Sequence, residues 1–152
     1  MHFSTFIPTI LFGSSVGIYR ETLTFSPRCR YLCTESSLCN KLIGLCVGFG
    51  VHKNSVRFGW IYNRHTDNID LCAYVYNAGH LTKIWRRSVE FGQPHTYEVV
   101  LHADGGYEMY MDDAPFHGGT LQLTRKPRWY TTLGLYFGGR MRCPHDMYVF
   151  IG

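Results

Sequence analysis

Residues 49–60 read Phe-Gly-Val-His-Lys-Asn-Ser-Val-Arg-Phe-Gly-Trp, and side-chain character alternates toward the end of this stretch. Successive side chains of a β-strand point to opposite faces, so Phe58 and Trp60 would share one face while Arg57 would lie on the other. The aromatic face suits a hydrophobic core, whereas a half-buried strand rarely needs a guanidinium on its second face. The stretch therefore predicts a strand with one core face and one candidate binding face.

The composition predicts a single all-β domain over residues 1–152. Of the 152 residues, 45% are apolar and 17% are charged, which is typical of a globular chain with a substantial core. The 16 glycines, 11 tyrosines and 10 phenylalanines favour short strands and tight turns over helices. Short strands separated by frequent turn signals are typical of an antiparallel β-sandwich or a barrel.

The charge of the chain is mildly basic, at +4, which is compatible with an anionic partner. The chain contains no lysine-rich run of the kind that would indicate a nucleic-acid partner. No stretch approaches the run of about 20 apolar residues that a membrane span requires. The apolar residues 3–18 are interrupted by Pro8 and Gly13, and no Lys or Arg precedes them. The sequence therefore favours the cytoplasm or a virion over secretion, with secretion kept as an alternative.

The cysteines are spaced irregularly and include no Cys-x-x-Cys pair, so a structural zinc site is not expected. A domain of this length does not need disulfides for stability. We therefore expect reduced thiols, mostly buried, at Cys29, Cys33, Cys39, Cys46, Cys72 and Cys143.

Short alternating runs recur from residue 16 onward, and turn signals such as Asn77-Ala78-Gly79 separate them. One expected turn contains Pro115 with Gly118 and Gly119. The expected strands cover residues 16–25, 28–33, 41–51, 54–62, 69–76, 81–87, 95–102, 107–112, 120–124, 130–137 and 146–151.

Matching the apolar faces of residues 54–76 sets the register of one hairpin. Pairing Trp60 with Leu71 leaves Arg57 opposite Tyr74 on the second face. A four-residue loop at 77–80 then adds the next strand to that face, with Lys83 beside Tyr74 and Trp85 beside Cys72.

A second hairpin is expected in residues 95–112. A three-residue loop at 104–106, with glycine in the left-handed region, would place Leu101 opposite Met109 and Val99 opposite Met111.

The second face of the first hairpin collects cations and aromatic rings. Such a mixture suits sugar stacking, anion binding or a protein interface. In the alternative interpretation, other segments cover this face and satisfy its polar groups internally. With the turn residues at its entry, the candidate ligand-binding set is Arg57, Tyr74, Tyr76, Lys83, Trp85, His52 and Asn54.

Several stretches resemble a family of proteins of similar length from gut-type bacteria and their phages. They are Lys-Leu-Ile-Gly at 41–44, the residues from Gly to Trp at 48–60, and Ala-Tyr-Val-Tyr-Asn at 73–77. Leu-Gly-Leu-Tyr-Phe-Gly-Gly at 133–139 and Pro-His-Asp-Met at 144–147 resemble the C-terminal signature of the family.

This resemblance spans residues 20–152 and implies a concanavalin-like jelly roll, by fold analogy. The family has no established activity to transfer. Many of its members carry a second histidine where this chain has Val51, which weakens any proposal that needs a histidine pair there.

The catalytic alternatives have weaker signals. His52, His145 and Asp146 would form a metal site if their strands were neighbours, although Pro144-His145-Asp146 also reads as a turn. No nucleophile motif is present, and the acidic residues are too scattered for a glycosidase pair. We therefore expect neither a metal nor another cofactor.

The sequence thus favours a non-catalytic β-sandwich module that binds a glycan or surface polymer. A structural or assembly subunit of a phage virion and a metal-dependent hydrolase are the alternatives. The expected partner is a glycan or a protein subunit, with a homo-oligomer or virion assembly left open.

Overall fold

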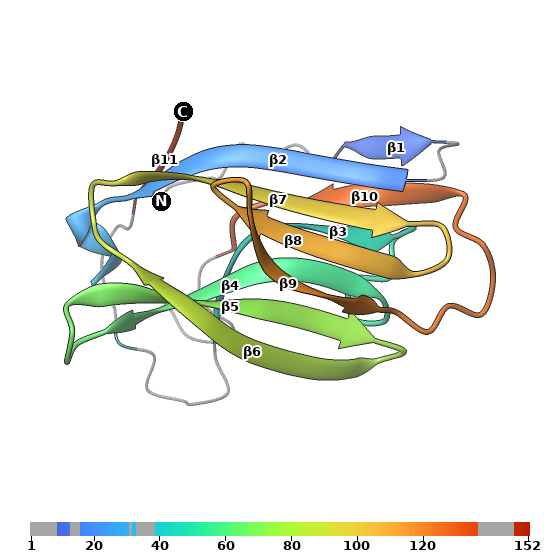
Figure 1. The fold of residues 1–152 in the computed structure, drawn as a ribbon, viewed down its shortest axis with the longest axis horizontal. Helices are drawn as coiled ribbons and strands as arrows, with labels where there is room; N and C mark the ends of the chain where they lie inside the picture. The colour runs from blue at the N-terminus through green and yellow to red at the C-terminus, as the bar shows by residue number, and fades with distance from the viewer. Residues whose placement is uncertain (1–8, 13–15, 31, 33–38, 137–147) are drawn as a thin grey trace.

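The fold, taken from a computed structural model, consists of two antiparallel sheets packed face to face (Figure 1). The structure describes residues 9–12, 16–30, 32, 39–136 and 148–152. One sheet has six strands in the order β1 (Ile10–Phe12), β10 (Trp129–Leu133), β3 (Asn40–Val47), β4 (Ser55–Asn63), β5 (Asn68–Asn77) and β6 (His80–Val89). The other has five in the order β11 (Val149–Ile151), β2 (Val16–Phe25), β7 (Pro94–His102), β8 (Gly106–Met111) and β9 (Ala114–Thr120). This arrangement confirms the all-β sandwich of jelly-roll type.

The core lies between the two sheets, as the alternating pattern of β4 predicts. Trp60 is fully buried and packs edge-on against Phe25 of β2, with 5.0 Å between ring centroids. The ring of Phe58 packs against Tyr97 of β7 and Phe116 of β9, with 5.1 and 4.9 Å between ring centroids. These aromatic contacts across the sandwich give the six-stranded sheet a fixed inner face, so the outward residues of β4 have defined positions.

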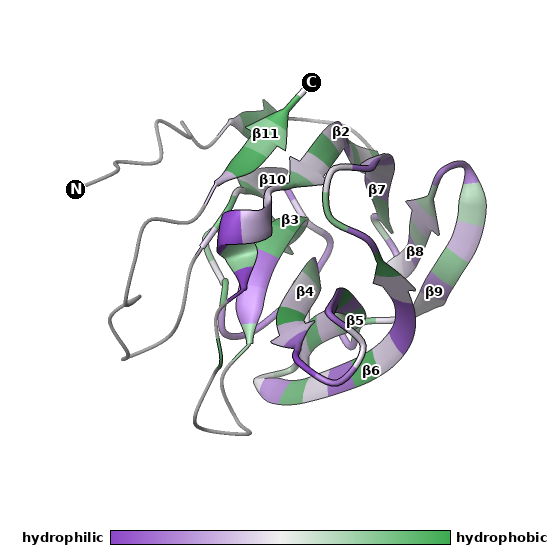
Figure 2. Cartoon of the chain, turned by 90° about the vertical axis from the view of Figure 1, so that its left-hand side faces the viewer, coloured by the Kyte–Doolittle hydropathy of each residue, from purple (hydrophilic) through white to green (hydrophobic). Residues whose placement is uncertain are grey.

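The register of β4, β5 and β6 agrees with the sequence prediction. Arg57 lies opposite Tyr74, and Trp60 lies opposite Leu71. On the other side of β5, Lys83 is paired with Tyr74. Figure 2 shows hydrophilic and hydrophobic residues alternating along β6, the edge strand of this sheet.

The predicted register of the β7–β8 hairpin is wrong by two residues. Val99 lies opposite Met109, and Leu101 lies opposite Tyr107. The loop does contain three residues, but it covers 103–105 rather than 104–106. Gly105 takes the left-handed conformation at φ 93°, and its N–H donates to the His102 carbonyl, which closes the turn one residue early.

The region after β8 also differs from the prediction. Residues 114–120 form β9, although a turn was expected at Pro115, Gly118 and Gly119, and residues 121–128 form a loop, although a strand was expected at 120–124. Asp112 and Asp113 both have positive φ and make a two-residue hairpin turn. Because β9 is an edge strand, it tolerates Pro115, and Gly119 packs beneath the Tyr107 hydroxyl.

In the part of the range 28–33 that the structure describes, the predicted strand is not formed, because Pro27–Cys29 is a short 3-10 helix. Proline fixes φ near −65° and lacks an N–H, which suits the first helical position. The strand predicted at 130–137 ends earlier than expected, since β10 stops at Leu133 and Tyr136, which lies beyond it, is 50% exposed. Cys29, Cys39, Cys46 and Cys72 are reduced thiols as expected, and Cys33 and Cys143 lie outside the described residues.

Within the described ranges, no helix is long and apolar enough to cross a membrane.

Candidate binding face

Arg57 points away from the core because it alternates with Val56 and Phe58 along β4. Its neighbour on β3 is Gly44, at the point where a bulge shifts the β3–β4 register. A Cβ on Gly44 would collide with the Val56 carbonyl oxygen and with the Arg57 side chain. Glycine at this position therefore leaves the room that the arginine stem occupies.

The Arg57 guanidinium is shielded although it lies on the outer face of the sheet. The residue is 8% exposed, and its Nη2 donates to the Gly134 carbonyl oxygen at 2.6 Å. Its Nε is buried and has no acceptor among the described residues. Burial lowers the pKa of Arg57 to about 10, so the side chain still carries its charge at neutral pH. A shielded cation without a described carboxylate partner is a candidate for binding an anionic or polar ligand.

Tyr74 lies beside Arg57 on β5 and contacts two lysines. Lys41 Nζ is 4.9 Å from the ring centroid and Lys83 Nζ is 5.9 Å from it, within the range of cation–π attraction. Burial and the neighbouring Tyr76 raise the pKa of the Tyr74 hydroxyl, so it remains protonated. The ring thus connects cations from three strands of one face.

Of the four remaining predicted site residues, Tyr76, His52 and Trp85 are partly or fully exposed, whereas Asn54 is buried. Tyr76 continues the face, with its ring 5.9 Å from that of Tyr74 and 5.3 Å from that of His52 in the β3–β4 turn. Trp85 is 45% exposed on β6, opposite Cys72. Asn54 does not lie on the face: it is buried and its Oδ1 accepts the Ala78 N–H, which holds two turns together.

Sequence reasoning missed Lys41 and Tyr136. Backbone hydrogen bonds of 2.8 and 3.0 Å pair these two residues, and Lys41 Nζ is 5.3 Å from the Tyr136 ring. The alternation of β3 could have placed Lys41 outward, but the bulge before Gly44 hides that signal. We define the cation–tyrosine face by its described members Lys41, Arg57, Tyr74, Tyr76, Lys83 and Tyr136.

Beneath this face, the Cys39 and Cys72 sulfur atoms lie 3.8 Å apart. They flank Gly59, where an added Cβ would come within 2.7 and 2.8 Å of the two sulfurs. The hydrogen bond with Cys39 and burial raise the pKa of the Cys72 thiol. The two cysteines pack with Tyr74 in one compact buried cluster, in which Tyr74 itself is 7% exposed.

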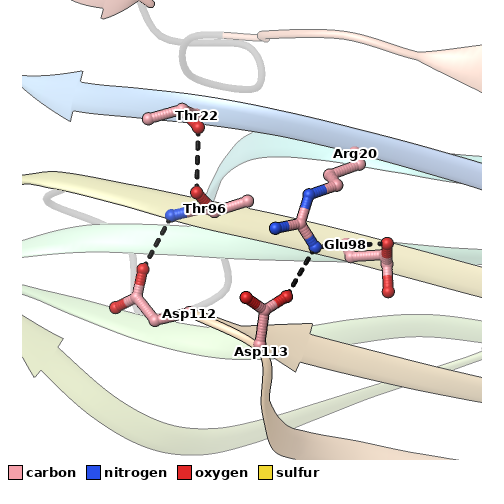
Figure 3. Close-up of polar contacts among 6 residues, drawn as sticks. All are labelled: Arg20, Thr22, Thr96, Glu98, Asp112 and Asp113. Carbon is pink, nitrogen blue, oxygen red and sulfur yellow. Dashed lines mark hydrogen bonds and ion pairs between the residues drawn. The ribbon is translucent and has the colours of Figure 1, made fainter.

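The outer face of the opposite sheet has a different electrostatic character (Figure 3). Arg20 contacts Asp113 at 2.7 Å and Glu98 at 3.4 Å, so its charge is compensated by neighbouring carboxylates. Thr22 and Thr96 share a hydrogen bond of 2.8 Å across β2 and β7. On this part of the five-stranded sheet, Arg20 and the two threonines are therefore already engaged by neighbouring groups.

The described outward side chains of the six-stranded sheet include several cations and one carboxylate. Among the described residues of this sheet, Asp70 supplies the outward carboxylate, and its two oxygens accept hydrogen bonds from Ser88 and Asn63. No cluster of three or more potential metal ligands occurs within the described ranges. His145 and Asp146 lie outside those ranges, so the predicted His52/His145/Asp146 set is not addressed by the structure.

Comparison with known proteins identifies the fold class. No family model matches the chain, and no curated protein matches it. An alginate lyase from Pseudomonas aeruginosa is similar over 88% of this chain and 60% of its own, at 13% identity and a TM-score of 0.60. An alginate lyase from an Alteromonas species is similar over 80% of this chain and 52% of its own, at 12% identity and a TM-score of 0.51. The chain thus spans less than two thirds of either lyase, and the likeness shows a shared sandwich fold.

Proposed function

We propose that this protein is a non-catalytic glycan-binding module that uses the cation–tyrosine face. The observation that carries the proposal is Arg57, a shielded, charged guanidinium on the strand beside Tyr74 without a described carboxylate partner. A sugar hydroxyl or carboxylate that accepts from Arg57 would satisfy the donor capacity that the protein leaves unused.

The surrounding groups support the same ligand class. Tyrosine rings offer apolar area for sugar C–H groups together with a hydroxyl for hydrogen bonding. Lys41 and Lys83 are held against Tyr74, so the face is partly preorganised. The two lyases named above act on alginate, a polysaccharide, and we extend from them the general class of ligand alone.

The absence of catalysis belongs to this proposal, and two features support it. The Tyr74 hydroxyl is kept protonated by its raised pKa, so it is a poor general base. The outward carboxylate of Asp70 is engaged by Ser88 and Asn63, whereas a glycosidase needs two available carboxyl groups. Incubation with a bound polysaccharide should therefore release no shorter products.

A glycan array with a matched pair of variants tests the proposal. Tyr76→Leu removes a half-buried ring hydroxyl from the face, and Tyr110→Leu makes the same change on the outer face of the opposite sheet. We expect wild type and Tyr110→Leu to give the same saturable hits, and Tyr76→Leu to lose them at least about fivefold, as a binding anchor would. Equal signals from both variants, or a blank array for all three proteins, would refute the assignment.

A further inference from the structure

A groove of about 280 Å³ lies at the end of the sandwich where β3 turns into β4. Figure 1 shows the long loop from β9 to β10 at the right-hand end of the molecule, where β5 ends and β6 begins. This loop forms one wall of the groove, and the β3–β4 turn forms the other. We call it the basic groove, and its principal lining residues are Gly48, Lys53, Arg125, Lys126, Arg128 and Trp129.

The charge of the basic groove has one sign. Of its described lining residues, four carry cationic side chains and none is acidic. In the part of the chain that the structure describes, these four side chains form no ion pair or hydrogen bond. Asp104 lies in the adjoining hollow, where its carboxylate accepts the Gly106 N–H. The like charges repel one another, and a bound anion would relieve that repulsion.

The walls of the groove are fixed by hydrogen bonds, although its cations are exposed. The Gly48 N–H donates to the Trp129 carbonyl at 2.9 Å and joins the β3–β4 turn to β10. The Gln122 N–H donates to Asn77 Oδ1 at 2.7 Å and joins the β9–β10 loop to the end of β5. The loop that carries Arg125, Lys126 and Arg128 is therefore anchored at both its ends, which lowers the entropic cost of binding.

The groove also continues from the cation–tyrosine face. Lys53 lines the groove, and its neighbour His52 packs its ring against Tyr76 of the face. A polymer lying across the tyrosines would reach the cations of the groove by passing over this one turn.

We propose that the basic groove binds carboxylate or sulfate groups of a polysaccharide, so that the ligand of the cation–tyrosine face is an acidic glycan. This inference rests on the proposed function and adds the substrate class to it. The groove volume is close to the lower end of small-molecule sites, roughly 300 Å³, which suits one charged sugar residue. Single-stranded nucleic acids are bound by rows of exposed rings beside cations, whereas the described lining of this groove contains one aromatic ring, the partly buried Trp129.

Titration calorimetry with defined oligomers tests this inference. The probes are oligogalacturonate, a heparin oligosaccharide, a neutral cello-oligosaccharide and oligo-dT. The groove variant is Arg125→Gln/Lys126→Gln, and the control of equal net charge is Arg64→Gln/Arg87→Gln, which changes exposed cations on other elements. Tyr76→Leu reports separately on the sheet face.

We expect at least one acidic oligosaccharide to bind wild type and the control equally, and about tenfold more weakly to the groove variant. The difference should shrink in 1 M salt, where screening is strong. The carboxylate and sulfate probes show which acidic group the groove prefers, and either preference supports the inference.

Three outcomes would overturn it. If the groove variant matches the control while Tyr76→Leu abolishes binding, the groove inference fails and the proposed function stands. Tighter binding of oligo-dT than of either acidic oligosaccharide would replace the glycan with a nucleic acid. If no oligosaccharide binds any of the proteins, both proposals fail.

Discussion

Gly44 shows how one small residue determines the position of a candidate ligand-binding side chain. It faces Arg57 across the β3–β4 bulge, where an added Cβ would meet the Val56 carbonyl oxygen. The close approach involves backbone as well as side chain, so it cannot be relieved by a rotamer change alone. The sequence shows a glycine at this place but gives no indication of which neighbour requires it.

We expect Gly44→Ala to destabilise the protein by about 2 kcal/mol, the usual range for overpacking a buried site. The control is Gly50→Ala in the β3–β4 turn, whose added Cβ would have its nearest neighbours at an ordinary 3.4 Å. Urea unfolding of both variants measures the two changes. A Gly44→Ala variant as stable as Gly50→Ala would mean that the strands separate freely here and that Arg57 is not held in place by them.

At the scale of elements, a carboxylate–guanidinium pair links the segment after β2 to the β4–β5 turn. Asp67 accepts from Arg30 Nε at 2.7 Å and from Arg30 Nη2 at 2.8 Å, and it also accepts from the Tyr62 hydroxyl at 3.0 Å. The hydrogen bonds from Arg30 and Tyr62 hold the pKa of Asp67 below its usual value. A carboxyl whose pKa is lower in the folded state adds stability above its unfolded pKa, about 3.9, and loses it as the pH falls through the folded value.

The stability difference between wild type and Asp67→Asn should therefore be larger at about pH 7 than at about pH 3. Asparagine suits this control because residue 67 has a positive φ of 53°, which asparagine tolerates. Thermal unfolding at the two pH values measures the difference. An identical difference at both values would show that the ion pair contributes nothing in solution, as happens for many exposed pairs.

The elements that sequence reasoning placed correctly are those with strict alternation and short turns. The register of β4 with β5 follows from matching Trp60 with Leu71, because a one-residue slip would turn the apolar side chains of one strand away from the core. β9 was missed because Pro115 and the glycines after it usually mark turns, and an edge strand is the exception. The β7–β8 register failed because two adjacent glycines allow the three-residue loop to begin at either of two positions.

The residues of the candidate site were likewise predicted only in part. Arg57, Tyr74 and Lys83 come together because they lie on consecutive strands whose register the core residues determine. Lys41 and Tyr136 could not be added, since their meeting depends on a bulge in β3 and on the path of the chain after β10. The basic groove likewise depends on residues 121–128 being a loop, whereas part of that range was expected to be a strand.

At the scale of the whole molecule, the net charge of +4 is unevenly distributed. On the five-stranded sheet, Arg20 is compensated by Glu98 and Asp113. On the six-stranded sheet, Arg57 has no described carboxylate partner, and the groove at the end of that sheet is lined by cations. The electrostatic field of such an uneven charge distribution steers an anionic polymer to one side of the sandwich. The two faces should therefore differ in binding even though both are polar.

The most direct test of this account measures stability and glycan binding together for Arg57→Met, with Arg64→Met in the exposed β4–β5 turn as the control. Replacing a buried, uncompensated charge by an apolar side chain of similar length is often neutral or stabilising. We predict an unfolding free energy within about 1 kcal/mol of wild type or above it, and a glycan-array signal about tenfold weaker, while Arg64→Met behaves as wild type. A folded Arg57→Met variant that binds glycans as well as wild type would contradict the central claim that this arginine serves a ligand.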